Sequence, residues 1–370
     1  MVTAASREIL LVAFDPSADG HGARVLKKLQ ENYQARAFGL GGPALQAAGM
    51  EITARADRLA AVGISEATHA AVQALRLWRV LESEARRRRP AAALLMDAPD
   101  FNLPLARRLK RLDIPVVYYI APQAWAWRRR RVKKLKQRVR RLCVILPFEE
   151  QFFRGHGLDA EYVGHPLMEE QLSVRDNRPG RVLVLPGSRR HEVKRLLPLL
   201  CRTAELLGQR HPQLVFQLPL APGLERAWVE ELLRHSSFEV EIEPAGARAC
   251  LAGACLALCA SGTVTLEAAL AGVPQVVCYR LSWLSYLLAR LLVRVEHASL
   301  VNLLLGERLV PEFIQNRVRP ELMAEAGLGL LENETARARM LDGYRRLHEL
   351  LGQKRPAQRV ARILAEVAGW

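Results

Sequence analysis

The chain has 370 residues, 50% of them hydrophobic, with 54 Lys and Arg against 38 Asp and Glu, which gives a net charge of +16. This length predicts about two folded domains, and the positive charge favours an anionic partner without saying which. No uncharged run reaches the ~18–20 residues of a membrane-spanning helix, so the sequence excludes that class of protein. The six cysteines lack the paired spacing of a zinc site, and we expect buried thiols in a reducing cytoplasm.

Short apolar runs alternate with amphipathic segments along the whole chain, which predicts an α/β fold with parallel sheets flanked by helices. The first apolar run is too short for a signal peptide and is expected to be a strand. The pattern restarts at Arg181 after a polar stretch that ends in Pro-Gly, so we expect two doubly wound domains joined near residues 166–180. Strands are expected at residues 8–14, 91–97, 115–120, 143–147, 181–186, 214–220, 239–244, 256–261 and 275–280, and helices at 23–33, 103–112 and 191–207.

Parallel sheets bind ligands at the carboxyl ends of their strands, so the loops after the strands are the candidate sites. The first expected strand leads into FDPSADG, where small and polar residues precede a helix. Asp15, Ser17 and Asp19 could bond to the hydroxyl groups of a sugar, and they could equally cap that helix.

The strand at residues 91–97 leads into DAPDFN, which places two carboxylates at a strand end. Asp97 follows an apolar run, so we expect partial desolvation to raise its pKa and let it accept a proton from an attacking hydroxyl. Asp100 suits the role of a helix cap, and Asn102 supplies an amide.

Ten of the fourteen residues from Arg128 to Arg141 are basic. The spacing of Val132, Leu135 and Val139 predicts a helix with one apolar face and a dense cationic face. Such a surface could bind nucleic acid, an anionic membrane or a phosphorylated small molecule, or it could be a solvated helix face. Leu59–Val80 and residues 281–295 are further candidates for contact with a membrane.

Two loops of the second half resemble anion sites, because each places small residues and hydroxyl groups at the start of a helix. Each loop alone could be a helix cap, but two such loops together predict a nucleotide diphosphate, and a glutamate one turn into the second helix suggests a clamp for the ribose. Neither a Walker A sequence nor a DxD pair for a metal–diphosphate is present, and His165 is expected to be structural more often than ligand-binding. The residues concerned are Gly187, Ser188 and Arg189 in the first loop, and Ser261, Gly262, Thr263 and Glu267 in the second.

A series of motifs from about residue 38 to 315 resembles that of the lipid-A-disaccharide synthases. PQAWAW with its basic tail and DAPDFN are specific to that resemblance, whereas PGSR and SGTVTLE are shared with other two-domain glycosyltransferases. The series runs GLGGPALQAAGM, AVGISEA, MDAPDFN, YYIAPQAWAWRRRRVKK, LPFEEQFF, VGHPL, LPGSRRHEV, ASGTVTLEA, SLVNLL and LVPEFIQ.

The resemblance implies a GT-B fold, in which two Rossmann-like domains face each other across a cleft. Residues 1–165 would form the acceptor and membrane-facing domain, 166–345 the UDP-sugar domain, and 346–370 a helix that packs back on the first domain or on a partner. The implied reaction is an inverting transfer, without metal or cofactor, from UDP-2,3-diacylglucosamine to 2,3-diacylglucosamine 1-phosphate. Its products would be a β-1,6-linked disaccharide 1-phosphate and UDP.

The same resemblance assigns roles by position. Asp97 matches the catalytic base, with Asp100 beside it, while Arg189 and Glu267 match the nucleotide loop and the ribose clamp. The family usually opens with GEASGD, and here FDPSAD stands in its place, so that Phe14 is expected to narrow the acceptor side. The remaining matches are Asn302 and Gln315 on the donor side, and Asp15, Ser17, Asp19, Asn102, Gln123 and Trp125 on the acceptor side.

A transferase with such substrates would work at an anionic membrane surface, on the cytoplasmic side of the inner membrane, without nucleic acid and as a possible homodimer. Two alternatives stay open at this point. Another GT-B enzyme, such as a UDP-sugar 2-epimerase or a transferase for a different acceptor, would share the nucleotide loops. A non-catalytic protein could instead bind nucleic acid through the basic segment, in a salt-sensitive manner.

Overall fold

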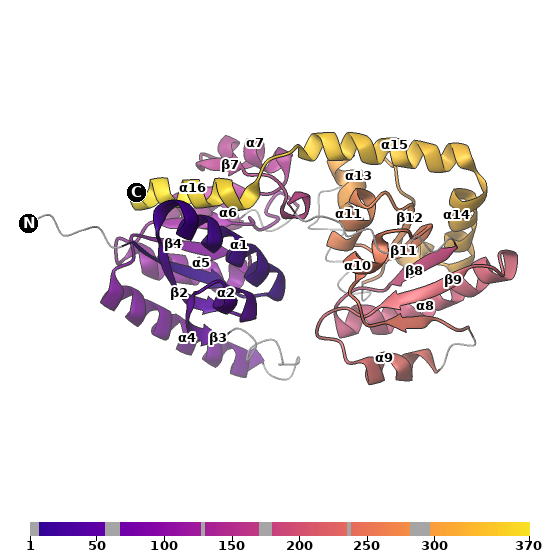
Figure 1. Cartoon of the computed structure of the whole chain (residues 1–370), viewed down its shortest axis with the longest axis horizontal. Helices are drawn as coiled ribbons and strands as arrows, with labels where there is room; N and C mark the ends of the chain where they lie inside the picture. Colours follow the sequence, from indigo (N-terminus) through magenta and orange to yellow (C-terminus); the bar gives the residue numbers. More distant parts are fainter. Residues whose placement is uncertain (1–6, 56–66, 127–129, 170–179, 235–237, 282–296) are drawn as a thin grey trace, which may run out of the picture. The chain divides into compact units, whose positions relative to one another are not determined.

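The computed structural model describes residues 7–55, 67–126, 130–169, 180–234, 238–281 and 297–370. The chain divides into two compact units (Figure 1). The first combines Met1–Glu169 with Leu351–Trp370, and the second is Glu170–Leu350. Each unit is built on its own parallel sheet, which confirms the expected pair of doubly wound α/β domains.

The first unit contains a seven-stranded sheet in the order β3-β2-β1-β4-β5-β6-β7. Every neighbouring pair is parallel, and the order reverses at β1, as in other doubly wound folds. Leu95 of β4 lies opposite Tyr118 of β5, and Met96 opposite Tyr119. The strands are β1 (Glu8–Ala13), β2 (Arg36–Gly41), β3 (Glu51–Arg55), β4 (Ala92–Met96), β5 (Val116–Tyr119), β6 (Arg141–Val144) and β7 (Ala160–Tyr162).

Successive side chains of these strands point to opposite faces, and helices bury both faces. Leu10 and Val12 lie on one face and Ile9 and Leu11 on the other. The first face packs against α4 (Ala67–Arg88), α5 (Pro99–Lys110), α6 (Arg130–Arg138) and α7 (Pro147–Gly155). The second packs against α1 (Pro16–Tyr33), α2 (Pro43–Ala47) and α16 (Pro356–Ala368).

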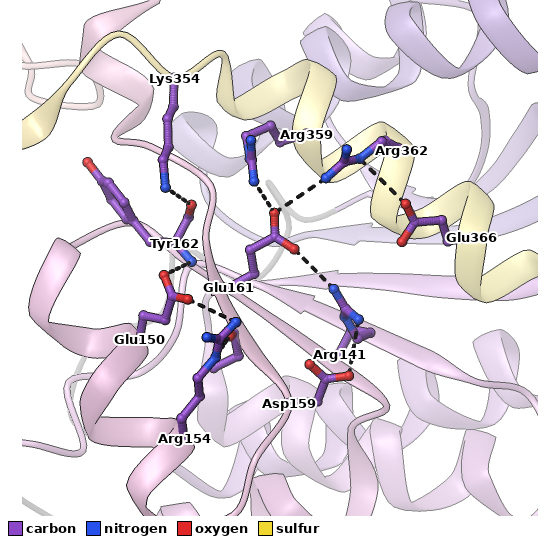
Figure 2. A network of polar contacts seen from close by, with 11 residues as sticks. Arg141, Glu150, Arg154, Asp159, Glu161, Tyr162, Lys354, Arg359, Arg362 and Glu366 are labelled. Atoms are coloured by element: carbon purple, nitrogen blue, oxygen red, sulfur yellow. Dashed lines mark hydrogen bonds and ion pairs between the residues drawn. The ribbon is translucent and has the colours of Figure 1, made fainter.

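The last helix, α16, lies beside α1 and closes the core of the first unit (Figure 1). Its buried residues include Val360, Ile363 and Leu364, which reach the core beneath α1. Polar contacts fasten the same helix to the edge of the sheet (Figure 2). Glu161 of β7 accepts hydrogen bonds from Arg141 of β6 at 3.0 Å and from Arg359 of α16 at 2.5 Å.

The second unit contains a six-stranded parallel sheet in the order β10-β9-β8-β11-β12-β13. One face packs against α10 and α11, and on the other Gly327 of α14 lies close to Leu207 of α8 and Leu256 of β11. The strands are β8 (Arg181–Leu185), β9 (Val215–Pro219), β10 (Glu241–Glu243), β11 (Leu256–Ala260), β12 (Gln275–Tyr279) and β13 (Glu312–Ile314). The helices are α8 (Arg190–Arg210), α9 (Arg226–Leu233), α10 (Ala247–Leu251), α11 (Thr263–Leu270), α13 (Leu300–Leu305), α14 (Pro320–Glu332) and α15 (Glu334–Leu351), with short 3-10 turns at Pro166–Met168 in the first unit and Gln315–Arg317 in the second.

All nine expected strands are confirmed, and the pattern missed β2, β3, β7 and β13. β7 and β13 have three residues each, too few to show a period. β2 contains Gly39, and glycine is rare inside strands. A Cβ at Gly39 would lie 2.2 Å from the carbonyl oxygen of Leu11, so this glycine permits the close approach of β2 to β1.

The basic segment differs from the single helix expected over residues 128–141. Helix α6 covers Arg130–Arg138, while Arg128 and Arg129 lie outside the described residues. Val132 and Leu135 are buried, as the expected apolar face requires. The helix ends because the N–H of Arg140 donates to the carbonyl of Val116 and the chain then continues as β6. Arg140 and Arg141 therefore do not belong to the cationic helix face.

The contacts of Glu161 predict that its charge stabilises the first unit. Glu161→Gln would remove the carboxylate that Arg359 contacts and one of the two that Arg141 contacts, the other being that of Asp159 at 3.1 Å. We expect a loss of about 1–2 kcal/mol in the free energy of unfolding, since these groups are partly exposed. Urea unfolding measures this loss of stability, and hydrogen exchange of the α16 amides shows whether that helix opens more often. The matched control is Glu366→Gln, whose carboxylate contacts Arg362 at 3.5 Å on the surface. Equal losses for the two substitutions would contradict the role of Glu161.

Candidate functional site

The DAPDFN loop lies at the carboxyl end of β4, in the middle of the first sheet. Asp97 and Ala98 have φ angles of 48° and 39°, so two consecutive residues other than glycine adopt the left-handed conformation. Pro99 then begins α5, where its fixed φ suits the first helical position. The chain therefore turns sharply at Asp97 and Ala98, between the end of β4 and the start of α5.

Asp97 has the raised pKa that its position in the sequence predicts. Burial is the largest cause, and the negative charge of Asp15 adds to it. The N–H of Ala98 and the charge of Arg131 act in the opposite direction. The carboxylate is therefore a stronger base than an ordinary exposed aspartate, and Asp15 lies close enough to influence it.

Asp100 and Asn102 have partners of their own. The exposed carboxylate of Asp100 accepts two hydrogen bonds from Nη2 of Arg131, at 2.7 and 2.8 Å. The amide of Asn102 is fully buried and donates to the carbonyl oxygens of Met96 and Asp97. These contacts couple Asp100 to α6 and make Asn102 a support for the turn.

The FDPSAD loop brings together residues with different surroundings. Asp15 and Ser17 are exposed at the start of α1, and Oγ of Ser17 lies 3.2 Å from Nε2 of His21. Asp19 is buried, and its carboxylate accepts hydrogen bonds from the backbone N–H groups of three residues at the start of α2. It therefore caps that helix from α1. The three residues are Gly42, Ala44 and Leu45.

Phe14 is partly buried and packs against the core of the first unit. Its ring centroid lies 5.2 Å from that of Phe101 in α5. The ring centroid of Trp78 in α4 lies 5.7 Å from that of Phe101. Phe14 therefore joins the FDPSAD loop to α5 and α4 through a row of aromatic contacts.

In the loop after β5, Gln123 is exposed and Trp125 is partly buried. The indole N–H of Trp125 donates to Glu149 at 2.9 Å, and its ring meets the ring of Phe148 edge-on. Glu149 also accepts hydrogen bonds from the N–H groups of Ile145 and Leu146, and burial raises its pKa to about 7. The sequence reasoning missed Glu149, although a glutamate at the third position of a helix is a capping signal.

His165 lies at the end of the first unit and is 4% exposed. Its Nδ1 accepts a hydrogen bond from the N–H of Leu167, and burial together with His21 lowers its pKa to about 4. The ring is therefore neutral at ordinary pH. It caps the short turn at Pro166–Met168, which is the structural role that the sequence favoured for this histidine.

In the second unit, the first predicted anion loop follows β8. Gly187 has a φ of 110°, and a Cβ there would lie 2.7 Å from Oε2 of Glu192, so the position requires glycine. Glu192 accepts hydrogen bonds from the N–H and from Nη1 of Arg189. Ser188 and Arg189 are exposed just before α8, a helix start of the kind that favours anions, and the binding of an anion there stays a prediction.

The second predicted anion loop follows β11 and begins α11. Gly262 and Thr263 are exposed, while the hydroxyl of Ser261 donates to the carbonyl of Ala298 at 2.7 Å. The fully buried Thr265 donates to the carbonyl of Gly262 at 2.8 Å. Glu267 lies half-buried one turn into the helix. The hydroxyl groups of Ser261 and Thr265 thus fix the loop, and Gly262 and Thr263 are its exposed residues.

Asn302 and Gln315 use their amides within the second unit. Asn302 is fully buried, donates to Val310 and Glu312, and accepts from the N–H groups of Leu309 and Val310. Gln315 accepts from the N–H of Leu281 at 2.6 Å. Both amides therefore hold backbone segments at the end of the sheet, and any contact with a ligand stays a prediction.

The structure also bears on the cysteines, on metal sites and on membrane-spanning helices. All six cysteines are free, and five of them are buried. In the part of the chain that the structure describes, no group of three His, Cys, Asp or Glu side chains could hold a metal ion. None of the helices described is long and apolar enough to cross a membrane.

Solved structures with a similar fold include glycosyltransferases of the GT-B type and epimerases. A UDP-GlcNAc 2-epimerase from Neisseria meningitidis bound to UDP-GlcNAc has a TM-score of 0.67 at 12% identity, over 97% of this chain and 98% of that one. The kitacinnamycin glycosyltransferase has a TM-score of 0.65 at 17% identity, over 97% and 98%. At these identities the likeness shows the fold alone.

Sequence relatives are much closer. The chain is 43% identical to the lipid-A-disaccharide synthase of Anaeromyxobacter sp. (strain K) over 96% of each chain. It is 37% identical to that of Myxococcus xanthus (strain DK1622) over 97% of each chain. The sequence model of the family described as lipid-A-disaccharide synthetase matches residues 9–366. The chain is a glycosyltransferase with a GT-B fold and belongs to the lipid-A-disaccharide synthetase family.

Proposed function

We propose that this protein transfers 2,3-diacylglucosamine from its UDP donor to the 6-hydroxyl of 2,3-diacylglucosamine 1-phosphate. The single observation that carries the proposal is the half-buried carboxylate of Asp97 at the central strand end of the first sheet, with its raised pKa. Membership of the family supplies the substrates. The first unit would hold the acceptor, and the second the UDP moiety.

The chemistry needs a base and a stabilised leaving group. The acceptor oxygen attacks the anomeric carbon, the bond from that carbon to the UDP oxygen breaks, and the proton of the hydroxyl passes to Asp97. Negative charge then develops on UDP. The N-termini of α8 and α11 and the guanidinium of Arg189 are the groups proposed to stabilise it. Glu267 is proposed to accept from the ribose hydroxyls.

The reaction itself is tested by incubating the protein with both diacylated substrates and analysing the products by mass. The wild type should yield the disaccharide 1-phosphate and UDP, with little effect of EDTA. Release of a free sugar with no disaccharide would instead support a UDP-sugar 2-epimerase. In the same assay, Asp97→Asn should lower the rate by roughly 100-fold or more, because it removes the base and keeps the shape.

The matched control is Asp113→Asn. Asp113 is exposed and has a φ of 57°, so it shares the left-handed conformation of Asp97, and it follows the other end of α5. Asparagine tolerates this conformation as well as aspartate does. Turnover of Asp97→Asn equal to that of Asp113→Asn would contradict the assignment of the base.

The nucleotide site is tested by the binding of UDP in calorimetry. Arg189→Ala should weaken UDP binding about tenfold, since one charge-assisted hydrogen bond is lost. Glu267→Gln should also weaken UDP binding, because the carboxylate proposed to accept hydrogen bonds from the ribose hydroxyls becomes a neutral amide. Arg190→Ala is the control, because the guanidinium of Arg190 lies 4.7 Å from the ring of Trp228. The assignment fails if Arg190→Ala weakens UDP binding as much as Arg189→Ala does.

The proposed partner of the first unit is an anionic membrane, at the cytoplasmic face of the inner membrane. Helices α4, α5 and α6 lie side by side over one face of the sheet. On α4 the side chains of Val72, Leu75 and Val80 are 48%, 41% and 42% exposed. An apolar stripe of this kind, beside cationic helices, is typical of a helix that lies on a lipid surface.

The same three helices also carry exposed basic residues. They are Arg76 and Arg79 on α4, Arg107 and Lys110 on α5, and Arg130, Lys133 and Lys134 on α6. Leu77 and Trp78, which the sequence suggested as lipid contacts, instead pack against the core. Residues 59–66 and 282–295 of the other suggested segments lie outside the described residues.

Binding to vesicles of anionic phospholipid tests this surface. Each basic residue near such a surface contributes about 1 kcal/mol, so Lys133→Glu with Lys134→Glu should lower the partition coefficient by roughly 30-fold or more at low salt. Val72→Gln with Leu75→Gln should weaken binding at high salt as well, because salt does not screen apolar contacts. UDP affinity should stay unchanged in both variants.

The control for the charge reversal is Lys27→Glu with Lys28→Glu. These two lysines are also adjacent, but they lie on α1, which packs on the opposite face of the sheet. If both reversals weaken vesicle binding equally, net charge rather than the surface of α4, α5 and α6 attracts the membrane.

A further inference from the structure

The left-handed turn at Asp97 and Ala98 is unfavourable by itself. For residues with a Cβ this conformation brings the side chain too close to the following carbonyl, and alanine has no polar group to compensate. The conformation persists only where the surroundings impose it. The contacts of the two peptide groups therefore identify the residues that aim Asp97.

The carbonyl oxygen of Asp97 has two side-chain donors. The hydroxyl of Tyr118 donates to it from the neighbouring strand β5, and Nδ2 of Asn102 donates from the first turn of α5 at 2.9 Å. The same amide donates to the carbonyl of Met96 at 2.8 Å. The N–H of Asp97 continues the sheet by donating to Tyr119.

Burial of the Tyr118 hydroxyl and of the Asn102 amide costs free energy of desolvation, and apolar packing at these positions would not require either polar group. Tyr118 is fully buried among aliphatic side chains such as Leu10 and Leu95, where phenylalanine would need no partner. Oδ1 of Asn102 is buried and has no hydrogen-bond partner among the described residues. Burial and the charge of Asp97 raise the pKa of Tyr118 well above its usual range, so its hydroxyl remains a donor.

We propose that Tyr118, together with Asn102, is a positioning residue that holds the backbone of Asp97 left-handed and so aims its carboxylate at the acceptor hydroxyl. The inference rests on the proposed function for its catalytic part. Tyr118 acts through the backbone and touches no substrate. Its loss should therefore affect the chemical step more than substrate binding.

The test substitution is Tyr118→Phe, which removes one oxygen atom and keeps the ring. We expect kcat to fall about 10- to 100-fold, because a small misplacement of a catalytic group has effects of this size, while KM for the donor changes little. The acid limb of kcat/KM should move to lower pH, since a relaxed turn exposes Asp97 to water and lowers its pKa. Amide hydrogens of Phe101 and Asn102, which donate to Ala98, should exchange roughly tenfold faster.

The matched control is Tyr162→Phe. Tyr162 is also buried in the first unit, and its hydroxyl donates to a backbone carbonyl, that of Leu351, at 2.7 Å. Tyr162→Phe should lower the free energy of unfolding about as much as Tyr118→Phe does. It should leave kcat, the pH profile and the hydrogen exchange of Phe101 and Asn102 unchanged. Adding Ala98→Gly to Tyr118→Phe should restore part of kcat, because glycine adopts the left-handed conformation freely.

The proposed function and the positioning role of Tyr118 can fail independently. A wild type that forms no disaccharide overturns the proposed function, and the exchange of Phe101 and Asn102 then still decides whether Tyr118 holds the turn. A Tyr118→Phe protein with unchanged kcat, an unchanged acid limb and exchange equal to that of Tyr162→Phe overturns the positioning role.

Discussion

Burial of both faces of two parallel sheets is the constraint on which the rest of the molecule depends. With helices on each side, the strands carry almost only apolar residues, such as Ile9 to Val12 and Leu183 to Leu185. Polar function is thereby confined to the strand ends, where the chain turns from sheet to helix. Most of the candidate residues lie on such a turn or on the first turn of the helix that follows it; Glu267 lies one turn into α11, and Asn302 lies on α13.

The same constraint decides how the turns are held. A turn at the end of a buried strand has backbone groups that water reaches poorly, so side chains must satisfy them. Asp19 does this for the start of α2, Asn102 for the end of β4, and Asn302 for the segment before β13. Much of the polarity around the candidate site is therefore structural.

The sequence predicts the fold well because the short apolar runs of buried strands alternate with amphipathic segments of helical period along the chain. It predicts the raised pKa of Asp97 for a related reason, since an acidic residue directly after a buried apolar strand is partly removed from water. It cannot separate the exposed Asp15 from the buried Asp19, because that difference arises from the position of α2, which Asp19 itself caps. Glu149 and Tyr118 were missed because their partners, Trp125 and the carbonyl of Asp97, are distant along the chain.

The return of the chain to the first unit affects the order in which the protein can fold during synthesis. The core beneath α1 includes Val360, Ile363 and Leu364 of α16, which the ribosome makes after all the strands of both sheets. Until α16 arrives, the apolar face of the first sheet lacks part of its cover, although the strands that form it were made first. The second unit is continuous in sequence and has no such delay. Completion of the amino-terminal unit therefore has to wait until the second unit has been synthesised, and the uncovered face is where a nascent chain would most need a chaperone.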